Sequence, residues 1–310
     1  MIQFQTTISH YLQFCQYQKC LDSKTIKAYR IDLNQFGSSL PDISAERITP
    51  QVLEAYLAQL HQTYKPRTAK RKIASLKAFF KWLEFRDLIT ANPFNKIQVK
   101  FREPVVLPKI IPIHSIETLL RTMYRQKQQT ATVLQAKWIL RDIAAVELLF
   151  ATGIRISELC SLTTADLNLQ DGNILIHGKG SKERRIQIGS SDVLSALCEY
   201  KDAYRTELEN SGWFFINRIH QRLSEQSVRY IIQKYASMAN IEQHITPHMF
   251  RHSFATYLLE ADVDIRCIQE MLGHSSIHIT EIYTHVSTAR QKDILSTRHP
   301  RIHFCCKDEM

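Results

Sequence analysis

The sequence predicts a mainly α-helical fold in two domains, with a small antiparallel β-hairpin in the second. Three observations support this fold class. The chain has 310 residues, a length typical of two domains, and 44% of them are hydrophobic, enough to form real cores. The first hundred residues show helical periodicity with almost no strand signal. Farther on, one pair of β-favouring runs flanks a glycine-containing turn, which is typical of a hairpin.

The N-terminal domain is expected over residues 1–98, where three helix-start signals occur. Asp22 or Ser23 can cap one helix, and Thr49-Pro50 and Pro66 open the next two. Each start is followed by apolar residues at helical spacing. These are Ile26, Tyr29, Leu33 and Phe36; Val52, Tyr56 and Leu60; and Ile73, Leu76, Phe79, Phe80 and Leu83. Asn92-Pro93 closes the helical region.

The helix that begins at Pro66 is unusually basic, and no acidic residue occurs in it before Glu84. Its basic residues are Lys65, Arg67, Lys70, Arg71, Lys72, Lys77 and Lys81. Because the apolar stripe occupies one face, we expect the basic residues to crowd the other, where they suit a phosphate backbone. A merely solvated basic face is the alternative. The candidate DNA-binding residues are Lys65, Arg67, Lys70, Arg71 and Lys77. The net charge of +10 also favours a polyanionic partner, although a generally basic enzyme would share it.

Residues 99–112 are expected to form an extended basic linker, because they contain three prolines and several β-favouring valines. Such a linker would let two domains close around a duplex like a clamp. Helices are expected from Ser115 to about Gln126 and from Ala136 to Phe150, separated by a polar stretch. The hairpin follows, from Asn173 to Ile188 around Gly178-Lys179-Gly180-Ser181, and the chain is helical again from Val193. We place the second domain at 113–300 and a tail at 301–310.

Four motifs in the second domain carry side chains suited to phosphodiester chemistry. They are Thr152-Gly153-Ile154-Arg155 with Glu158, His248 with Arg251, Leu272-Gly273-His274-Ser275, and Tyr283. His248 and Arg251 are spaced i, i+3 and share one helix face. An arginine fork binds two phosphate oxygens and stays charged. A histidine exchanges protons near neutrality, and a tyrosine can attack phosphorus. Together they can hold a phosphodiester and cleave it without metal.

This set of motifs resembles the tyrosine recombinase (phage integrase) family, and specifically its Xer-like branch, over roughly residues 5–300. The run Ser23-x-Thr25-x-x-x-Tyr29-x-x-Asp32-Leu33-x-x-Phe36 also resembles the core-binding domain of the family. The resemblance implies an N-terminal helical core-binding (SAM-like) domain and a C-terminal α+β catalytic domain that together form a clamp around DNA. Compared with Xer recombinases, the polar stretch after Gln126 looks several residues longer, as a surface insertion would be.

The resemblance also implies a role for each motif residue. Arg155 and Arg251 hold the scissile phosphate, and His274 donates to a nonbridging oxygen. His248 acts beside the phosphate as proton acceptor or hydrogen-bond donor. Lys179, with Lys182 as the second candidate, protonates the leaving 5′-oxygen. Tyr283 is the nucleophile that forms a 3′-phosphotyrosyl bond, and Glu158 orients the catalytic groups.

The implied partners are double-stranded DNA with inverted half-sites and further recombinase copies, in a homo- or hetero-tetramer on two DNA sites. The reaction is integration, excision or resolution at short core sites, without cofactor, metal or ATP. The core-binding pattern begins almost at Met1, so we expect no separate arm-binding domain. Seven irregularly spaced cysteines and the lack of a signal peptide or long apolar run indicate a cytoplasmic protein with reduced thiols and no membrane contact.

Three other readings stay open on sequence alone. A type IB topoisomerase uses similar chemistry, and a DNA-binding relative could have lost catalysis. Two histidine pairs spaced i, i+4, His248 with His252 and His274 with His278, could bind a metal, but neither forms an H-E-x-x-H motif. Tyr257 is the nearest rival to Tyr283, although it matches no attacking position of the family.

Overall fold

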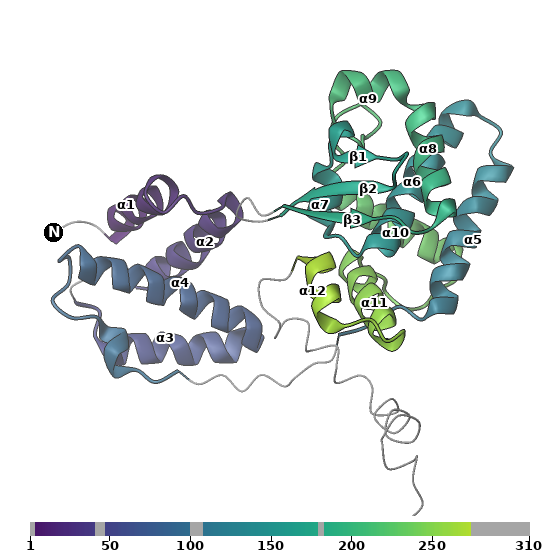
Figure 1. The fold of residues 1–310 in the computed structure, drawn as a ribbon. Coiled ribbons are helices and arrows are strands. Elements are labelled where there is room, and N and C mark those ends of the chain that lie inside the picture. The colour runs from purple at the N-terminus through teal and green to yellow at the C-terminus, as the bar shows by residue number, and fades with distance from the viewer. Residues whose placement is uncertain (1–3, 41–46, 100–107, 179–182, 274–310) are drawn as a thin grey trace, which may run out of the picture. The chain divides into compact units, whose positions relative to one another are not determined.

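The computed structural model describes residues 4–40, 47–99, 108–178 and 183–273. The chain divides into two compact units, Met1–Val105 and Val106–Met310, and each is treated by itself. Figure 1 labels their α-helices and strands. The first unit contains α1 (Phe4–Tyr17), α2 (Ser23–Ser39), α3 (Pro50–Thr63), α4 (Pro66–Phe85) and the 3₁₀ helix η2 (Pro93–Lys96). The second contains α5 (Ile113–Gln129), α6 (Val133–Thr152), α7 (Ile156–Ser161), η3 (Thr164–Asp166), β1 (Leu167–Asn168), β2 (Asn173–His177), β3 (Glu183–Gln187), α8 (Ser191–Ala203), α9 (Arg205–Ser211), α10 (Glu225–Met238), α11 (Pro247–Glu260) and α12 (Ile265–Leu272).

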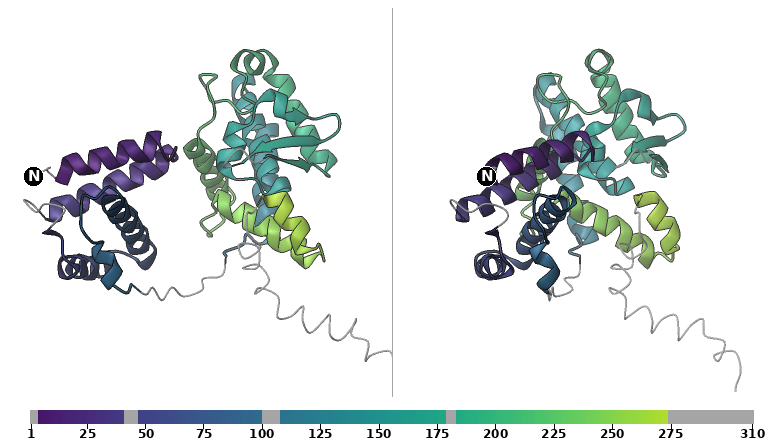
Figure 2. Two further views of the ribbon diagram at one scale, coloured as in Figure 1. Left: turned by 60° about the vertical axis from the view of Figure 1, so that its left-hand side comes forward. Right: turned by 90° about the vertical axis from the view of Figure 1, so that its left-hand side faces the viewer.

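Three helices of the first unit, α2, α3 and α4, begin where the sequence predicts. The Asp22 carboxylate accepts from the Lys24 backbone N–H at 2.7 Å and caps α2. The Thr49 hydroxyl caps α3 in the same way. Pro66 opens α4 at a position where a missing N–H costs nothing. The sequence did not single out α1, which lies beside α2, or η2, which extends the unit past Asn92 (Figures 1 and 2).

Aromatic side chains form the centre of the first unit. Phe36 of α2 and Phe79 of α4 are fully buried and pack edge-on against neighbouring rings. The Phe36 and Tyr56 ring centroids are 4.8 Å apart, and those of Phe79 and Tyr11 are 5.2 Å apart. Such pairs add about 1 kcal/mol each beyond the area they bury. The predicted apolar stripes of α2, α3 and α4 therefore meet in one core.

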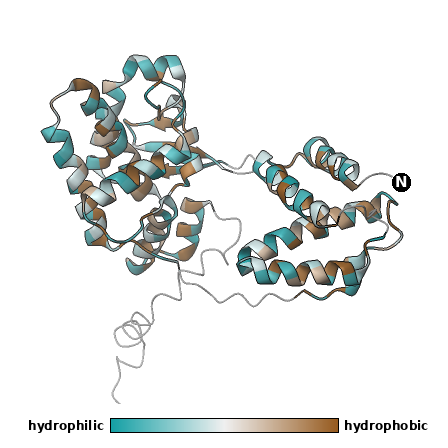
Figure 3. Ribbon diagram, turned by 180° about the vertical axis from the view of Figure 1, so that it is seen from behind, coloured by the Kyte–Doolittle hydropathy of each residue, from teal (hydrophilic) through white to brown (hydrophobic). Residues whose placement is uncertain are grey.

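The second unit is built around α6, which packs against α5, α8, α10 and α11. Almost every residue from Ile139 to Leu149 is buried. The helix ends at Gly153, whose φ of +59° is the left-handed conformation typical of a glycine C-cap. Figure 3 shows apolar residues concentrated on particular faces of the helices, as expected for amphipathic helices around a core.

The predicted hairpin is part of a three-stranded antiparallel sheet of order β1-β2-β3. In it Ile174 pairs with Ile186 and Ile176 with Arg184. The short strand β1 was not foreseen, because two residues give no periodic signal. The hairpin turn, residues 179–182, lies outside the described residues. The fold class is confirmed: the chain is mainly helical, with one small antiparallel sheet.

One prediction about α5 was wrong. The stretch from Gln126 to Thr132 was expected to separate two helices, but α5 continues to Gln129 and α6 begins at Val133. Polar side chains on an exposed helix end gave the appearance of a loop, and only residues 130–132 connect the helices.

Over the residues described, no helix is long and apolar enough to span a membrane.

Candidate active site and nucleic-acid interface

Arg155 is placed by a sharp turn between α6 and α7. The turn depends on Gly153, since a Cβ there would lie 2.6 Å from Cδ1 of Phe254, and the φ of +59° is unfavourable for other residues. Two residues later, the Arg155 backbone N–H donates to Glu158 Oε2 at 2.8 Å, and its Nη1 donates to Glu158 Oε1 at 2.7 Å. An ion pair therefore joins these two residues, and the same carboxylate caps α7.

Arg251 lies on α11 and is only 4% exposed. Its Nη1 donates to the carbonyl oxygen of Gly153 at 2.9 Å, and its Nη2 donates to that of Leu272 at 2.6 Å. Arg155 Nη2 is 3.5 Å from the next carbonyl oxygen, that of Gly273. Two arginines separated by 96 positions in the sequence (251 − 155) therefore converge on the end of α12.

The Glu158 carboxylate has a second cationic partner, Arg184, whose contact with Glu158 the sequence analysis did not predict. Arg184 of β3 donates through Nη2 to Glu158 Oε2 at 2.8 Å and through Nη1 to Oε1 at 3.1 Å. Its Nε donates to the carbonyl oxygen of Met271 at 2.8 Å. Burial opposes ionisation of Glu158, but the hydrogen bonds from Arg184 and Arg155 outweigh it and hold its pKa below the ordinary value.

Strand alternation is the signal that could have found Arg184. Residues 184 and 186 of β3 share one face of the sheet, and Ile186 is buried. A basic residue on the inward face of a strand needs a partner inside the protein. The neighbouring Arg185 points to the other face and is exposed.

His248 lies one helical turn before Arg251, as predicted, and its side chain is exposed to solvent. Desolvation by the surrounding protein, followed by the charges of Arg251, Arg229 and Arg155, lowers the pKa of its imidazole. Histidine has an ordinary pKa near 6.5, so His248 is neutral at pH 7 and able to accept a proton. Arg229 of α10 is a further positive charge near this site that the sequence analysis did not single out.

The remaining predicted catalytic residues, Lys179, His274 and Tyr283, lie outside the described residues, as do Lys182 and His278. The rival tyrosine is described. The Tyr257 hydroxyl donates to the Ile111 carbonyl oxygen at 2.7 Å, so its phenol is engaged with the segment before α5. Within the described ranges, no group of three or more His, Cys, Asp or Glu side chains is arranged to hold a metal ion.

The basic helix α4 presents most, but not all, of its cations to solvent. Lys65, Arg67, Lys70, Arg71 and Lys77 are exposed. Lys72 is not: its side chain is 5% exposed, and its Nζ lies 3.1 Å from Oδ1 of the fully buried Asp32. The expectation that all the basic residues crowd the outer face was therefore wrong for Lys72. The buried carboxylate on α2 compensates for its charge.

Asp32 organises the inner side of α4. Its carboxylate pairs with Lys72, accepts a hydrogen bond from the Ser75 hydroxyl at 2.8 Å, and forms an ion pair with Arg71. Lys72 also lies 4.8 Å from the centre of the Tyr64 ring. Arg71, whose side chain is 45% exposed, is thereby held against α2 while its guanidinium reaches the surface.

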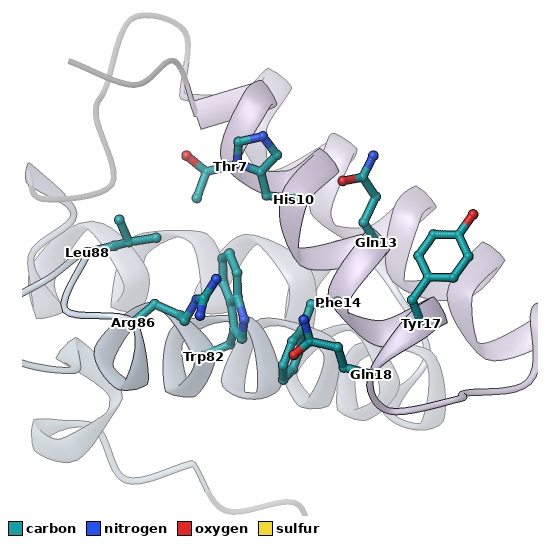
Figure 4. Close-up of a pocket in the computed structure, with 9 residues that line it drawn as sticks. All are labelled: Thr7, His10, Gln13, Phe14, Tyr17, Gln18, Trp82, Arg86 and Leu88. Carbon is teal, nitrogen blue, oxygen red and sulfur yellow. The ribbon is translucent and has the colours of Figure 1, made fainter.

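The first unit also contains a hollow of about 530 Å³ between α1 and α4 (Figure 4). It is lined by Thr7, His10, Gln13, Phe14, Tyr17, Gln18, Trp82, Arg86 and Leu88. None of the candidate DNA-binding residues lines it, and we assign it no part in the site.

Comparison with known families matches both units of the chain. The model of the phage integrase family matches residues 117–290, and that of the phage integrase N-terminal SAM-like domain matches residues 8–87. The chain belongs to the phage integrase family. A tyrosine recombinase from Agathobacter rectalis is 57% identical over 304 residues, covering 98% of this chain and 99% of the relative. The tyrosine recombinase XerD of Listeria monocytogenes is 38% identical, covering 95% and 98%.

The chain is thus an Xer-like tyrosine recombinase, an enzyme that cuts and rejoins DNA site-specifically, and this confirms the predicted function. Solved structures agree on the fold. A XerH recombinase bound to palindromic difH substrate superposes with a TM-score of 0.73 at 22% identity, covering 94% of this chain and 84% of that one. A lambda integrase tetramer bound to a Holliday junction gives 0.67 at 18%, covering 89% and 78%. These structural relatives bind DNA, the second as a tetramer.

Proposed function

We propose that this recombinase cleaves DNA through a 3′-phosphotyrosyl intermediate formed by Tyr283, with the scissile phosphate held between Arg155 and Arg251. One observation carries the proposal. Arg155 and Arg251 bond adjacent carbonyls at the end of α12, so two permanent positive charges meet immediately before His274 in the sequence. Convergent guanidinium groups of this kind suit the extra negative charge of a pentacoordinate phosphorus.

The proposed step balances with side chains alone. The Tyr283 oxygen attacks phosphorus and forms the phosphotyrosyl bond, while the bond from phosphorus to the 5′-oxygen breaks. Neutral His248 takes the phenolic proton, Lys179 supplies a proton to the 5′-oxygen, and His274 donates to a nonbridging oxygen. Rejoining reverses these steps, so the bond energy is kept and neither ATP nor a metal is needed. Glu158 fixes the orientation of Arg155.

We further propose that the basic face of α4 binds the DNA backbone. Lys65, Arg67, Lys70, Arg71 and Lys77 are exposed on one helix of the first unit. Phosphate contacts of this kind set register and affinity and carry little sequence information. In this proposal the N-terminal domain, residues 1–98, binds the core site, and the C-terminal domain, residues 113–300, carries out catalysis. Residues 99–112 link the two domains, which close around the duplex. The tail, 301–310, has no assigned role.

The partners we propose are double-stranded DNA with inverted half-sites and three further recombinase subunits, identical or related, in a tetramer on two sites. The support is the palindromic substrate of the XerH complex and the lambda integrase tetramer on a Holliday junction. We propose that the enzyme acts in the cytoplasm, in integration, excision or resolution.

A covalent-trapping experiment tests this proposal. Purified enzyme is mixed with fragmented genomic DNA in EDTA, denatured and separated on a gel, and the captured DNA is sequenced. We expect an adduct that survives EDTA, is enriched for one inverted repeat, and disappears in Tyr283→Phe but not in Tyr257→Phe. An adduct that persists in Tyr283→Phe would assign the nucleophile elsewhere. An adduct without sequence preference would indicate a topoisomerase-like activity, and no adduct would favour a catalytically silent relative.

A further inference from the structure

Arg184 of β3 is the last residue of the hairpin pattern Gly178-Lys179-Gly180-x-Lys182-x-Arg184, which resembles that of the family, but it has no role assigned above. It connects three parts of the site. Its Nη1 and Nη2 form a fork with the two oxygens of Glu158, at 3.1 and 2.8 Å, and its Nε donates to the Met271 carbonyl at 2.8 Å. Every nitrogen of the guanidinium therefore has a partner. The side chain is only 11% exposed. A lysine could satisfy one of these partners but not all three, because it lacks the planar fork.

The end of α12 is held by arginines at three consecutive carbonyls. Met271 accepts from Arg184, Leu272 from Arg251 and Gly273 from Arg155, although the last contact is long at 3.5 Å. Met271 and Leu272 belong to the last turn of α12 and Gly273 is its C-cap, so all three carbonyls lie at the negative end of the helix. Cations from β3, α11 and the start of α7 thus fix one helix end.

Gly273 makes this approach possible. A Cβ on Gly273 would lie 3.0 Å from Nη1 and 3.1 Å from Cδ of Arg184, and the residue has a φ of +63°. The absence of a side chain lets the Arg184 guanidinium lie directly over the last turn. Gly273 also precedes His274 in the chain. The close packing of Arg184 therefore depends on the glycine that ends α12.

Arg184 also shares the charge of Glu158 with Arg155. Glu158 Oε1 accepts from both guanidinium groups, and its Oε2 accepts from Arg184 and from the Arg155 backbone. Without Arg184, Arg155 would be the only guanidinium paired with the Glu158 carboxylate. That carboxylate would then compete with a phosphate for the Arg155 guanidinium. With Arg184 present, the cluster keeps a surplus of positive charge on the side of Arg155.

We propose that Arg184 is a positioning residue, which holds Glu158 and the end of α12 so that Arg155 and Arg251 face the same phosphate. The inference rests on the proposed roles of those two arginines. Arg184 acts through its neighbours, so its loss should slow strand cleavage much more than it weakens DNA binding. Misplacing a catalytic group by about 1 Å can cost about 100-fold in rate.

The test compares Arg184→Ala with Arg185→Ala, which removes the same charge from the next residue on the exposed face. The substrate is the DNA recovered by trapping, nicked so that cleavage is irreversible. Single-turnover adduct formation gives the rate, gel shift gives the affinity, and thermal melting confirms folding. We expect about a 100-fold slower rate for Arg184→Ala, with affinity within about threefold of that of Arg185→Ala, and partial rescue of the rate by added guanidinium ion.

Arg184→Lys keeps the charge and serves if the alanine variant does not fold. We expect it to cleave about tenfold more slowly than wild type, because it cannot bridge Glu158 and Met271 together. Equal rates for Arg184→Ala and Arg185→Ala, or full activity in Arg184→Lys, would overturn the inference. The proposed function would still stand if the wild type forms the Tyr283 adduct. A wild-type enzyme without that adduct would overturn both.

Discussion

The two units solve a similar electrostatic problem with different geometry. In each, a carboxylate with almost no exposed surface pairs with one inner and one outer cation. Asp32 holds Lys72 inside and Arg71 at the surface, and Glu158 holds Arg184 inside and Arg155 at the surface. The outer arginines are 45% and 36% exposed. In both arrangements, a buried carboxylate holds an arginine whose side chain is partly exposed to solvent.

The difference lies in what each carboxylate connects. Asp32 joins two continuous helices, and its cations are neighbours on α4. Glu158 joins the start of α7 to β3, and Arg184 extends that link to the end of α12. The first arrangement needs only charge on a surface, as binding to a uniform phosphate backbone does. The second fixes directions between distant segments, as a transition state requires. We therefore expect binding phenotypes in one region and rate phenotypes in the other.

The largest effect is expected for Arg251→Ala. Removing a donor from a preorganised oxyanion site costs about 1,000-fold in rate, or about 4 kcal/mol. Affinity for DNA should change much less, because the backbone contacts proposed for α4 remain. Single-turnover cleavage and gel shift on the trapped site measure the two quantities. Equal losses in rate and affinity would contradict the expectation that changes in the second unit affect the cleavage rate and changes in the first unit affect DNA binding.

A large loss of stability is expected for Asp32→Ala. The change leaves the ammonium of Lys72 buried with Gln35 and the Tyr64 ring but without a carboxylate, and losing the charged partner of a buried pair costs about 3–5 kcal/mol. Urea unfolding of the whole chain measures it, followed by the fluorescence of Trp82 in the first unit in a background where Trp138 and Trp213 are replaced by Phe. Arg71→Ala is the matched control, since its exposed side chain should contribute less than about 1 kcal/mol. If the two variants are equally stable, Asp32 does not serve the inner cation.

A smaller effect is expected for Lys70→Ala on α4. Loss of one phosphate contact should weaken DNA binding at every sequence and reduce the slope of log affinity against log salt by about one unit. The cleavage rate at saturating enzyme should stay unchanged. Lys201→Ala on α8 removes a charge that is also exposed, from the other unit, and is the control. An unchanged slope would place this face of α4 away from DNA.

The smallest effect concerns the lowered pKa of His248. Because its folded pKa lies below the unfolded value near 6.5, the unfolded chain binds the proton more readily. Stability should therefore fall as the pH drops through about 6.5, and part of that fall should vanish in His248→Gln. Urea unfolding at a series of pH values measures it. His252→Gln should remove a further part of that fall, because the pKa of His252 is also lowered. A pH dependence identical in wild type and His248→Gln would contradict this assignment.

Local signals in the sequence predicted most of the fold. Thr49-Pro50 and Pro66 placed two helix starts. The helix expected to end at Phe150 continues to Thr152, where Gly153 caps it. Long-range partners could not be predicted in the same way. Nothing near Lys72 indicates that Asp32, forty positions earlier, compensates for its charge and allows its burial. The contacts of Arg251 with Gly153 and Leu272 depend on how α11 packs against α6 and α12. The roles of Lys179, His274 and Tyr283 stay predictions, since those residues lie outside the described part of the chain.

The most direct test of the central claim, that the arginines neutralise a phosphate at the end of α12, uses a neutral substrate. A methylphosphonate at the scissile position of the trapped DNA removes the charge of one nonbridging oxygen. The account predicts that the rate defects of Arg155→Ala and Arg251→Ala shrink by about tenfold or more on this substrate, since there is less charge to stabilise. Defects of equal size on the charged and neutral substrates would contradict it and assign the two arginines a structural role.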